Sequence, residues 1–189
     1  MESYNHEVLK EKAIQWLWES KDCRYIATEI KIGRYIFDVV GSDGSRVYII
    51  EAKQALADYK RECNDPKDIR KNIKLFREEF HDTGDKKLYL ERISKERDKG
   101  IKFYDDSLLK LSSARYIIAP DGMITNVPFN WGLINEEPRQ IEGCKNGKIN
   151  KSMSEKVVRY ICRKNTKKYL ESIGVVFEKN VQWSKKDIV

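Results

Sequence analysis

One stretch of the chain, residues 33–62, restricts its possible folds more than any other: GRYIFDVVGSDGSRVYIIEAKQALADYKRE. Its first part alternates side chains as a β-strand does, and 42–45 supplies Ser, Asp and Gly, which favour tight turns. The second apolar part, 47–53, is rich in β-branched and aromatic residues, and 55–62 has the composition of a short helix. We therefore expect a β-hairpin that leads directly into a helix.

The expected hairpin brings three charged side chains together. In the first strand Ile36, Asp38 and Val40 are expected on one face, because successive side chains of a strand point to opposite faces. In the second strand Glu51 and Lys53 share a face for the same reason. With a suitable register, Asp38 lies opposite or diagonal to Glu51, with Cβ atoms about 5–8 Å apart.

Two carboxylates on neighbouring strands form a hard-oxygen site that suits Mg²⁺ or Mn²⁺ rather than zinc. The backbone carbonyl of Ala52 is a candidate third ligand beside Asp38 and Glu51. Lys53 could orient a water molecule, deprotonate it, or neutralise charge that develops on a phosphate. The alternative is a surface cluster of charges beside a hairpin. Two more residues are candidates to support the site by hydrogen bonds: Gln54 and Asp58.

Composition indicates a folded globular protein without a membrane span. The 189 residues suit one domain, and 40% of them are apolar. Charged residues make up 35% of the chain, and no apolar run approaches the roughly 20 residues that cross a bilayer. The N-terminus shows no secretory signal and the four cysteines lie far apart, so we expect reduced thiols, no zinc site and a cytoplasmic location.

The positive charge favours a phosphate-bearing partner. The net charge is +7, and basic residues concentrate between 139 and 168, where a helix beginning at Ser152 or Ser154 is expected. Anionic membranes or acidic proteins could use the same charge, and a basic helix can simply be a solvated one. Four cations of this helix are our candidate contacts to a DNA backbone: Lys156, Arg159, Arg163 and Lys167.

The N-terminal segment 3–19 is expected to form an amphipathic helix. Glu7, Ile14 and Trp18 form a second line of side chains along this helix, beside its main apolar stripe. If the second line is also covered, Glu7 points into the protein. The alternative is a solvated glutamate in the first turn. The main apolar stripe has four members: Leu9, Ala13, Trp16 and Leu17.

The segment 24–32 reads as a strand in which Glu29 is either an edge carboxylate or a member of the site. Strict alternation would divide it into two faces: Ile26, Thr28, Ile30 and Ile32 on one, and Tyr25, Ala27, Glu29 and Lys31 on the other.

The stretch 63–113 is highly charged, and its charges are either solvated or turned toward nucleic acid. Asp65-Pro66 predicts a helix start, 88–99 a second helix, and 105–113 a third. Beyond it we expect four strands: 115–119, 132–134 pairing with 140–142, and 175–178.

The pattern of Asp38 followed by Glu51-Ala52-Lys53 resembles the core of the PD-(D/E)xK nuclease superfamily. More narrowly, the chain is similar to the MmcB-like DNA repair family over 28–62, and loosely over 115–134. The residues that carry the narrower likeness are Glu29, Gly33-Arg34, Asp38, Glu51, Lys53 and Asp58-Tyr59.

The resemblance implies an α/β fold with a restriction-endonuclease-like core, in which helices flank a mixed central β-sheet. The chain would be a single nuclease-like domain over 1–189. Its core would occupy about 3–62 and 115–178, with a charged helical insertion at about 63–113.

The resemblance also implies a Mg²⁺-dependent DNA endonuclease of the repair type, with Mn²⁺ as a substitute metal. Catalysis would rest on Asp38, Glu51 and Lys53, with Glu7 as the first-helix glutamate that some members add to the metal site. The alternatives are a catalytically inactive nuclease-fold protein that binds DNA, and an interaction module that binds a protein through 65–110. Because relatives of the resolvase and restriction type often act as dimers, a homodimer is a further option.

Overall fold

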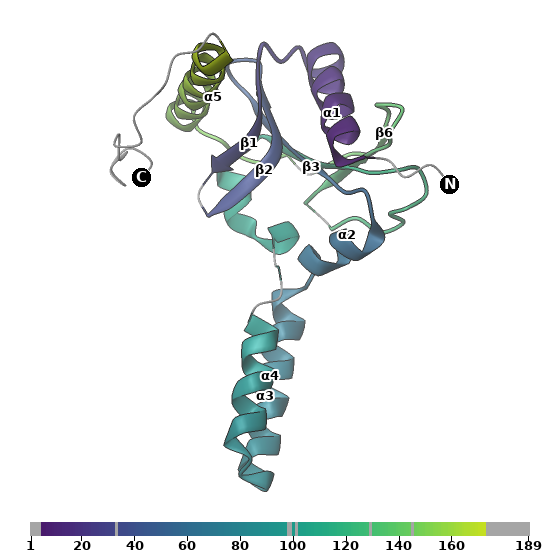
Figure 1. Cartoon of the computed structure of the whole chain (residues 1–189), viewed down its shortest axis with the longest axis vertical. Helices are drawn as coiled ribbons and strands as arrows, with labels where there is room; N and C mark the ends of the chain where they lie inside the picture. The colour runs from purple at the N-terminus through teal and green to yellow at the C-terminus, as the bar shows by residue number, and fades with distance from the viewer. Residues whose placement is uncertain are drawn as a thin grey trace.

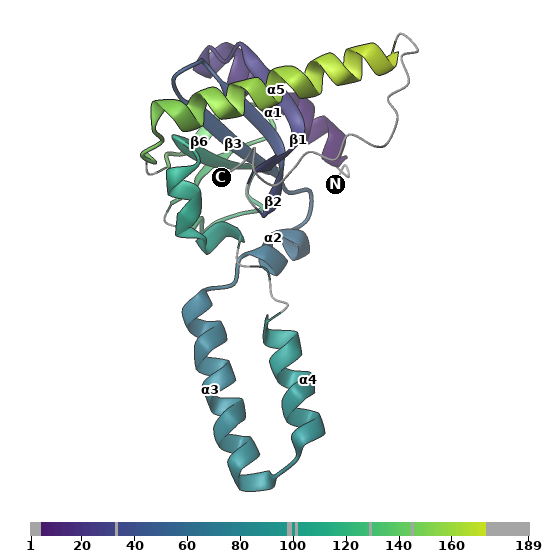
Figure 2. The ribbon, with the colours of Figure 1, turned by 90° about the vertical axis from the view of Figure 1, so that its left-hand side faces the viewer.

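The structure is a computed structural model that describes residues 5–172 except 33, 98, 99, 101, 129 and 145. Figures 1 and 2 show a body built around a sheet, from which a helical hairpin projects. The helices are α1 (His6–Lys21), α2 (Leu56–Glu62), α3 (Pro66–Thr83), α4 (Lys86–Arg97) and α5 (Lys151–Ser172), with the 3₁₀ helices η1 (Lys102–Tyr104) and η2 (Asp106–Lys110).

The sheet is mixed and follows chain order. The strands β1, β2 and β3 pair antiparallel, β3 to β4 and β4 to β5 pair parallel, and β6 returns antiparallel to β5. Every residue of β3 and β4 is buried, which explains why these two strands are almost continuously apolar in sequence. The strands are β1 (Tyr25–Ile32), β2 (Tyr35–Ser42), β3 (Val47–Ala52), β4 (Ala114–Ile118), β5 (Gly132–Ile134) and β6 (Gln140–Glu142).

Helix α1 covers one face of the sheet. Asn5 caps the helix by accepting a hydrogen bond from the Glu7 N–H at 3.1 Å. The predicted stripe is confirmed, because all four of its residues are buried against Val39 and Ile50. The second line is covered only at Ile14, which packs against this cluster, whereas Trp18 is 63% exposed and Glu7 66% exposed.

Helix α5 packs against the other face, where it contacts β1 and β2. Its Val157 and Ile161 join a buried cluster that includes Ile49 and Trp131. Two opposed helices over a mixed sheet confirm the expected α/β fold with a mixed central sheet flanked by helices. This arrangement is compatible with a restriction-endonuclease-like core.

Helices α3 and α4 form an antiparallel hairpin, residues 66–97, which we call the arm (Figures 1 and 2). Asp65 caps α3 with Pro66 in the first turn, as predicted, and Gly84 ends it at φ 70°. Among the described residues, the two buried clusters of the body contain none from the arm. The arm therefore packs on itself. The helix expected at 105–113 is present in part, as the short 3₁₀ helix η2, which a turn follows.

The strict alternation expected along the first two strands is wrong. Ala27 packs with Ile30 on one side of the sheet, so β1 changes face between them, and Glu29 has a left-handed φ of 55° there. On β2, Val40 shares that cluster with Phe37 rather than a face with Ile36, which is 61% exposed. The strand expected at 175–178 lies outside the described residues.

Candidate active site at the β2–β3 hairpin

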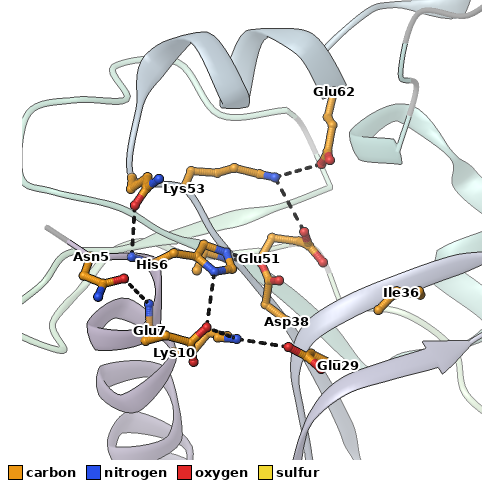
Figure 3. Close-up of polar contacts among 12 residues, drawn as sticks. Asn5, His6, Glu7, Lys10, Glu29, Ile36, Asp38, Glu51, Lys53 and Glu62 are labelled. Atoms are coloured by element: carbon orange, nitrogen blue, oxygen red, sulfur yellow. Dashed lines mark hydrogen bonds and ion pairs between the residues drawn. The ribbon is translucent and has the colours of Figure 1, made fainter.

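Two carboxylates occupy adjacent positions, with Asp38 midway along β2 and Glu51 near the end of β3. Val39 pairs with Ile50, and this antiparallel register places Asp38 across from Glu51. The Asp38 side chain is 20% exposed, whereas that of Glu51 is 2% exposed. The hairpin thus brings together one accessible and one buried carboxylate. Figure 3 labels both residues.

Asp38 is held by contacts from the end of β3 and from the start of α1. Its Oδ2 accepts a hydrogen bond from the Ala52 N–H at 2.8 Å, and His6 Nε2 lies 3.4 Å from the same oxygen. The His6 backbone N–H in turn donates to Gln54 Oε1 at 3.0 Å. These contacts join the start of α1 to the end of β3 and fix the orientation of Asp38 (Figure 3).

Glu51 lies between two ammonium groups. Lys102 Nζ is 2.6 Å from Glu51 Oε1, and Lys53 Nζ is 3.7 Å from Oε2. Lys53 also donates to Glu62 Oε2 at 2.9 Å, and Lys102 to the Ile36 carbonyl at 2.8 Å. The buried Oε1 of Glu51 therefore faces the Lys102 ammonium directly.

Burial is the main influence on Glu51. It disfavours the charged form and raises the pKa of Glu51 to about 7, although the Lys102 ammonium opposes this shift. The neighbouring Asp38 carboxylate adds to the rise. Because a carboxyl must lose its proton before it binds a metal ion, any metal binding at Glu51 would strengthen as the pH rises through this value.

Glu7 and Glu29 belong to an outer group linked by Lys10. Lys10 Nζ lies 2.6 Å from Glu7 Oε1 and 3.3 Å from Glu29 Oε1. The hydrogen bond from Lys10 lowers the pKa of Glu29. Glu7 is 66% exposed and lies 4.0 Å from the His6 ring, so its described contacts join it to neighbours of Asp38 rather than to Glu51.

Three members of the cluster were missed by sequence reasoning: His6, Glu62 and Lys102. Glu62 is the last residue of α2, the helix that directly follows Lys53 in the chain. This closeness in sequence could have suggested that its carboxylate reaches Lys53. Lys102 follows the arm and carries no local signal. Of the two predicted supporting residues, Gln54 contacts the site through His6, and Asp58 instead pairs with Arg61.

The basic helix α5 is engaged with β1. Lys164 donates to the Thr28 carbonyl at 2.8 Å, and Lys168 donates to the Thr28 hydroxyl at 3.1 Å. These bonds place the helix beside the strand that borders the Asp38 strand. The four predicted DNA contacts are all exposed on this helix: Lys156, Arg159, Arg163 and Lys167.

The described residues contain no group of three or more His, Cys, Asp or Glu side chains arranged to hold a metal ion. They also contain no helix with the length and apolar character that a bilayer span requires. The candidate site therefore offers two carboxylates, and further ligands would come from water or a bound phosphate.

Comparison with known proteins identifies a structure with a similar fold. No family model and no curated protein matches it. Among solved structures, it is similar to SPO1766 from Silicibacter pomeroyi, a protein of unknown function. The two share 11% sequence identity and a TM-score of 0.60, over 94% of this chain and 100% of the other. At this identity the likeness shows a common fold, and activity has to be argued from the site.

Proposed function

We propose that the chain is a Mg²⁺-dependent deoxyribonuclease that hydrolyses phosphodiester bonds at the Asp38–Glu51 pair. The observation that carries the proposal is the juxtaposition of these carboxylates, across adjacent strands, with the Lys53 ammonium 3.7 Å from Glu51. Carboxylate oxygens beside one lysine are the groups that metal-assisted attack on a phosphodiester requires.

The donor set fits a hard divalent cation. Asp38 and Glu51 offer carboxylate oxygens, and Lys102 Nζ, 2.6 Å from Glu51 Oε1, would have to move away before a metal ion could reach that oxygen. Ala52, the predicted third ligand, contacts Asp38 through its N–H, and its carbonyl remains a candidate. When bound, the cation would polarise the phosphodiester and lower the pKa of a water molecule.

The side chains have distinct tasks in this proposal. Asp38 and Glu51 hold the metal, and the Ala52 N–H keeps Asp38 in position. Lys53 places a positive charge beside the scissile phosphate, where it balances charge that develops during attack. Glu62 holds the Lys53 ammonium at 2.9 Å and so sets its direction. DNA would contact the exposed cations of α5 through its backbone.

One observation favours a second candidate, a nuclease-fold protein that binds DNA without cutting it. The Lys102 ammonium lies 2.6 Å from Glu51 Oε1, against an oxygen that would otherwise face a metal. If Lys102 stays there when DNA binds, a divalent cation meets a like charge at this position. The two candidates therefore differ in where Lys102 lies when DNA is bound. The nuclease requires Lys102 to leave Glu51, whereas the DNA-binding protein allows it to stay.

Cleavage of labelled DNA tests the proposal. The panel comprises single-stranded, duplex, flap, junction and abasic DNA, each with Mg²⁺, Mn²⁺ or EDTA. We expect metal-dependent cleavage by the wild type, its loss in Asp38→Asn, and a fall of at least about 10²-fold in Lys53→Met.

Two exposed substitutions, Asp22→Asn and Lys110→Met, remove the same charges away from the site and should cut like the wild type. Cleavage that survives in both site variants, or that ignores EDTA, contradicts the proposal. DNA binding without cleavage by any form of the protein supports the second candidate.

A further inference from the structure

The arm carries an uneven distribution of charge. Between 67 and 77 it has five basic residues and one acid, whereas between 78 and 91 it has two basic residues and five acids. The half of α3 that adjoins the body is thus strongly positive, and the far end of the arm is negative. A phosphate backbone would be attracted to the first half and repelled by the second.

The five cations of this half lie on one side of α3. At 3.6 residues per turn they fall within about 120° around the helix axis, and Asp68 lies about 60° beyond Lys71. We call them the basic stripe: Lys67, Arg70, Lys71, Lys74 and Arg77. All five side chains are exposed. Lys74 lies 3.8 Å from Glu78 at the end of the stripe, and the structure shows no ion pair from the other four to a described side chain.

The stripe begins close to the candidate active site. Glu62, which holds Lys53, precedes Lys67 by five residues, so the chain between them spans at most about 18 Å. At the other base of the arm, Asn64 contacts the Gly100 carbonyl, two residues before Lys102. Both bases of the arm therefore adjoin residues that contact Glu51 or Lys53.

The shape of the stripe suits a duplex better than a single strand. From Lys67 to Arg77, ten residues further along, the helix rises about 15 Å, a length in which B-DNA carries about nine phosphates. Proteins that hold single strands add aromatic side chains on which bases stack. The stripe has none, since Phe76 and Phe80 lie on another face and Phe80 stacks on Tyr89 at 4.9 Å.

We propose that the basic stripe of the arm binds the phosphate backbone of duplex DNA whose neighbouring segment lies at the candidate active site. This inference deepens the proposed function and rests on it for the identity of the partner. The arm then lengthens the DNA contact beyond the body and positions the duplex without reading its sequence.

The test is equilibrium binding of full-length protein to a fluorescein-labelled duplex, followed by fluorescence anisotropy in EDTA so that cleavage does not contribute. A length of about 30 base pairs, at about 3.4 Å each, covers both the arm and the site. The stripe variant is Lys67→Ala, Arg70→Ala and Lys71→Ala combined. We expect its Kd to rise at least about tenfold at about 0.1 M salt, and the slope of log K against log salt to fall by about 2–3.

Two variants serve as controls. Lys86→Ala, Lys87→Ala and Lys95→Ala combined remove the same charge elsewhere on the arm, and should bind almost as the wild type does. Lys67→Arg, Arg70→Lys and Lys71→Arg combined keep the charge, and should restore both affinity and slope. Thermal melts confirm that each variant is folded.

The results separate this inference from the proposed function. If the wild type binds the duplex and the stripe variant alone loses affinity, the inference holds, whether or not any DNA is cut. A stripe variant that binds like the wild type overturns it, even if cleavage is observed. Equal losses in the stripe variant and the Lys86 control variant overturn it too, because the effect is then one of net charge. Preference for single-stranded DNA by the wild type also overturns it.

Discussion

At the scale of single residues, the main feature of the site is the buried carboxylate of Glu51, whose negative charge is compensated by neighbouring ammonium groups. Glu51 is 2% exposed and is flanked by Lys102 and Lys53, while Glu62 pairs with Lys53 in turn. A buried charge costs several kcal/mol unless partners compensate it, so each ammonium stabilises the folded state as well as shaping the site. Under the proposed function, the same contacts would also control whether a metal ion can reach Glu51.

Lys102→Met tests this balance. Loss of the ammonium leaves Glu51 with Lys53 alone, and protonation of Glu51 can offset part of the cost. We therefore expect the free energy of unfolding in EDTA to fall by about 1–3 kcal/mol. Because a competing cation is removed, Mg²⁺ should stabilise the variant more than it stabilises the wild type.

Urea unfolding with EDTA and with Mg²⁺ measures both effects, and Lys110→Met, at an exposed position, is the matched control. Equal stability of Lys102→Met and wild type in EDTA would contradict the account of Glu51. Equal Mg²⁺ stabilisation of the two would show that Lys102 does not compete with the metal.

Asp43, in the turn between β2 and β3, gives a pH-dependent prediction. Burial alone would raise its pKa, but hydrogen bonds from the Arg46 and Ser45 backbone N–H groups, at 2.7 and 2.9 Å, outweigh burial and lower the pKa to about 2. Asp43 therefore stabilises the fold above its unfolded pKa of about 3.8, and this contribution is lost as the pH falls toward 2.

We expect Asp43→Asn to lower the free energy of unfolding by about 1–2 kcal/mol at pH 6 and by much less near pH 2.5. Denaturant unfolding across this range, beside the exposed control Asp22→Asn, gives the difference directly. A difference between Asp43→Asn and wild type that is constant with pH would refute the ionic origin of the effect.

At the scale of elements, sequence reasoning succeeded where structure is local. Alternation, turn residues and β-branched composition predicted the hairpin with Asp38 and Glu51 on neighbouring strands, and helix spacing predicted the buried stripe of α1. Alternation failed at Glu29, where a non-glycine residue adopts a left-handed φ of 55° and β1 changes face. No property of the glutamate side chain signals such a conformation, since packing of the surrounding sheet holds it.

The arm is the element that the structure separates most clearly from the body. Its bases meet where the Asn64 N–H and side chain contact the Gly100 carbonyl at 3.3 and 3.1 Å. Replacing 66–97 by a short Gly-Ser linker should therefore leave the free energy of unfolding within about 1 kcal/mol of the wild type, because closing a loop costs little when its ends already meet. The urea m-value should fall as less surface is exposed on unfolding.

Urea unfolding followed by circular dichroism measures both quantities, and the cooperativity of the transition shows whether the body folds without the arm. A loss of cooperative unfolding would contradict the view that the arm packs on itself. It would mean instead that the arm supports the body through contacts at its bases.

At the scale of the whole molecule, the site is assembled from four segments. The hairpin and the residue that follows it supply Asp38, Glu51 and Lys53. Helix α2 supplies Glu62, the start of α1 supplies His6, and η1 supplies Lys102. Only the hairpin could be predicted, because its residues are close in sequence. The positions of His6 and Lys102 depend on how α1 and the arm join the sheet, and this is set by long-range packing.

The central claim is that Asp38 and Glu51 hold a metal ion that drives phosphodiester cleavage. The most direct test is the rate of cleavage of the preferred DNA as a function of Mg²⁺ concentration, for wild type and Asp38→Asn under single-turnover conditions. The account predicts a rate that saturates with Mg²⁺ in the wild type, and a much higher Mg²⁺ requirement or no cleavage in the variant. Identical Mg²⁺ dependence in the two proteins would contradict it, because Asp38 would then have no part in holding the metal.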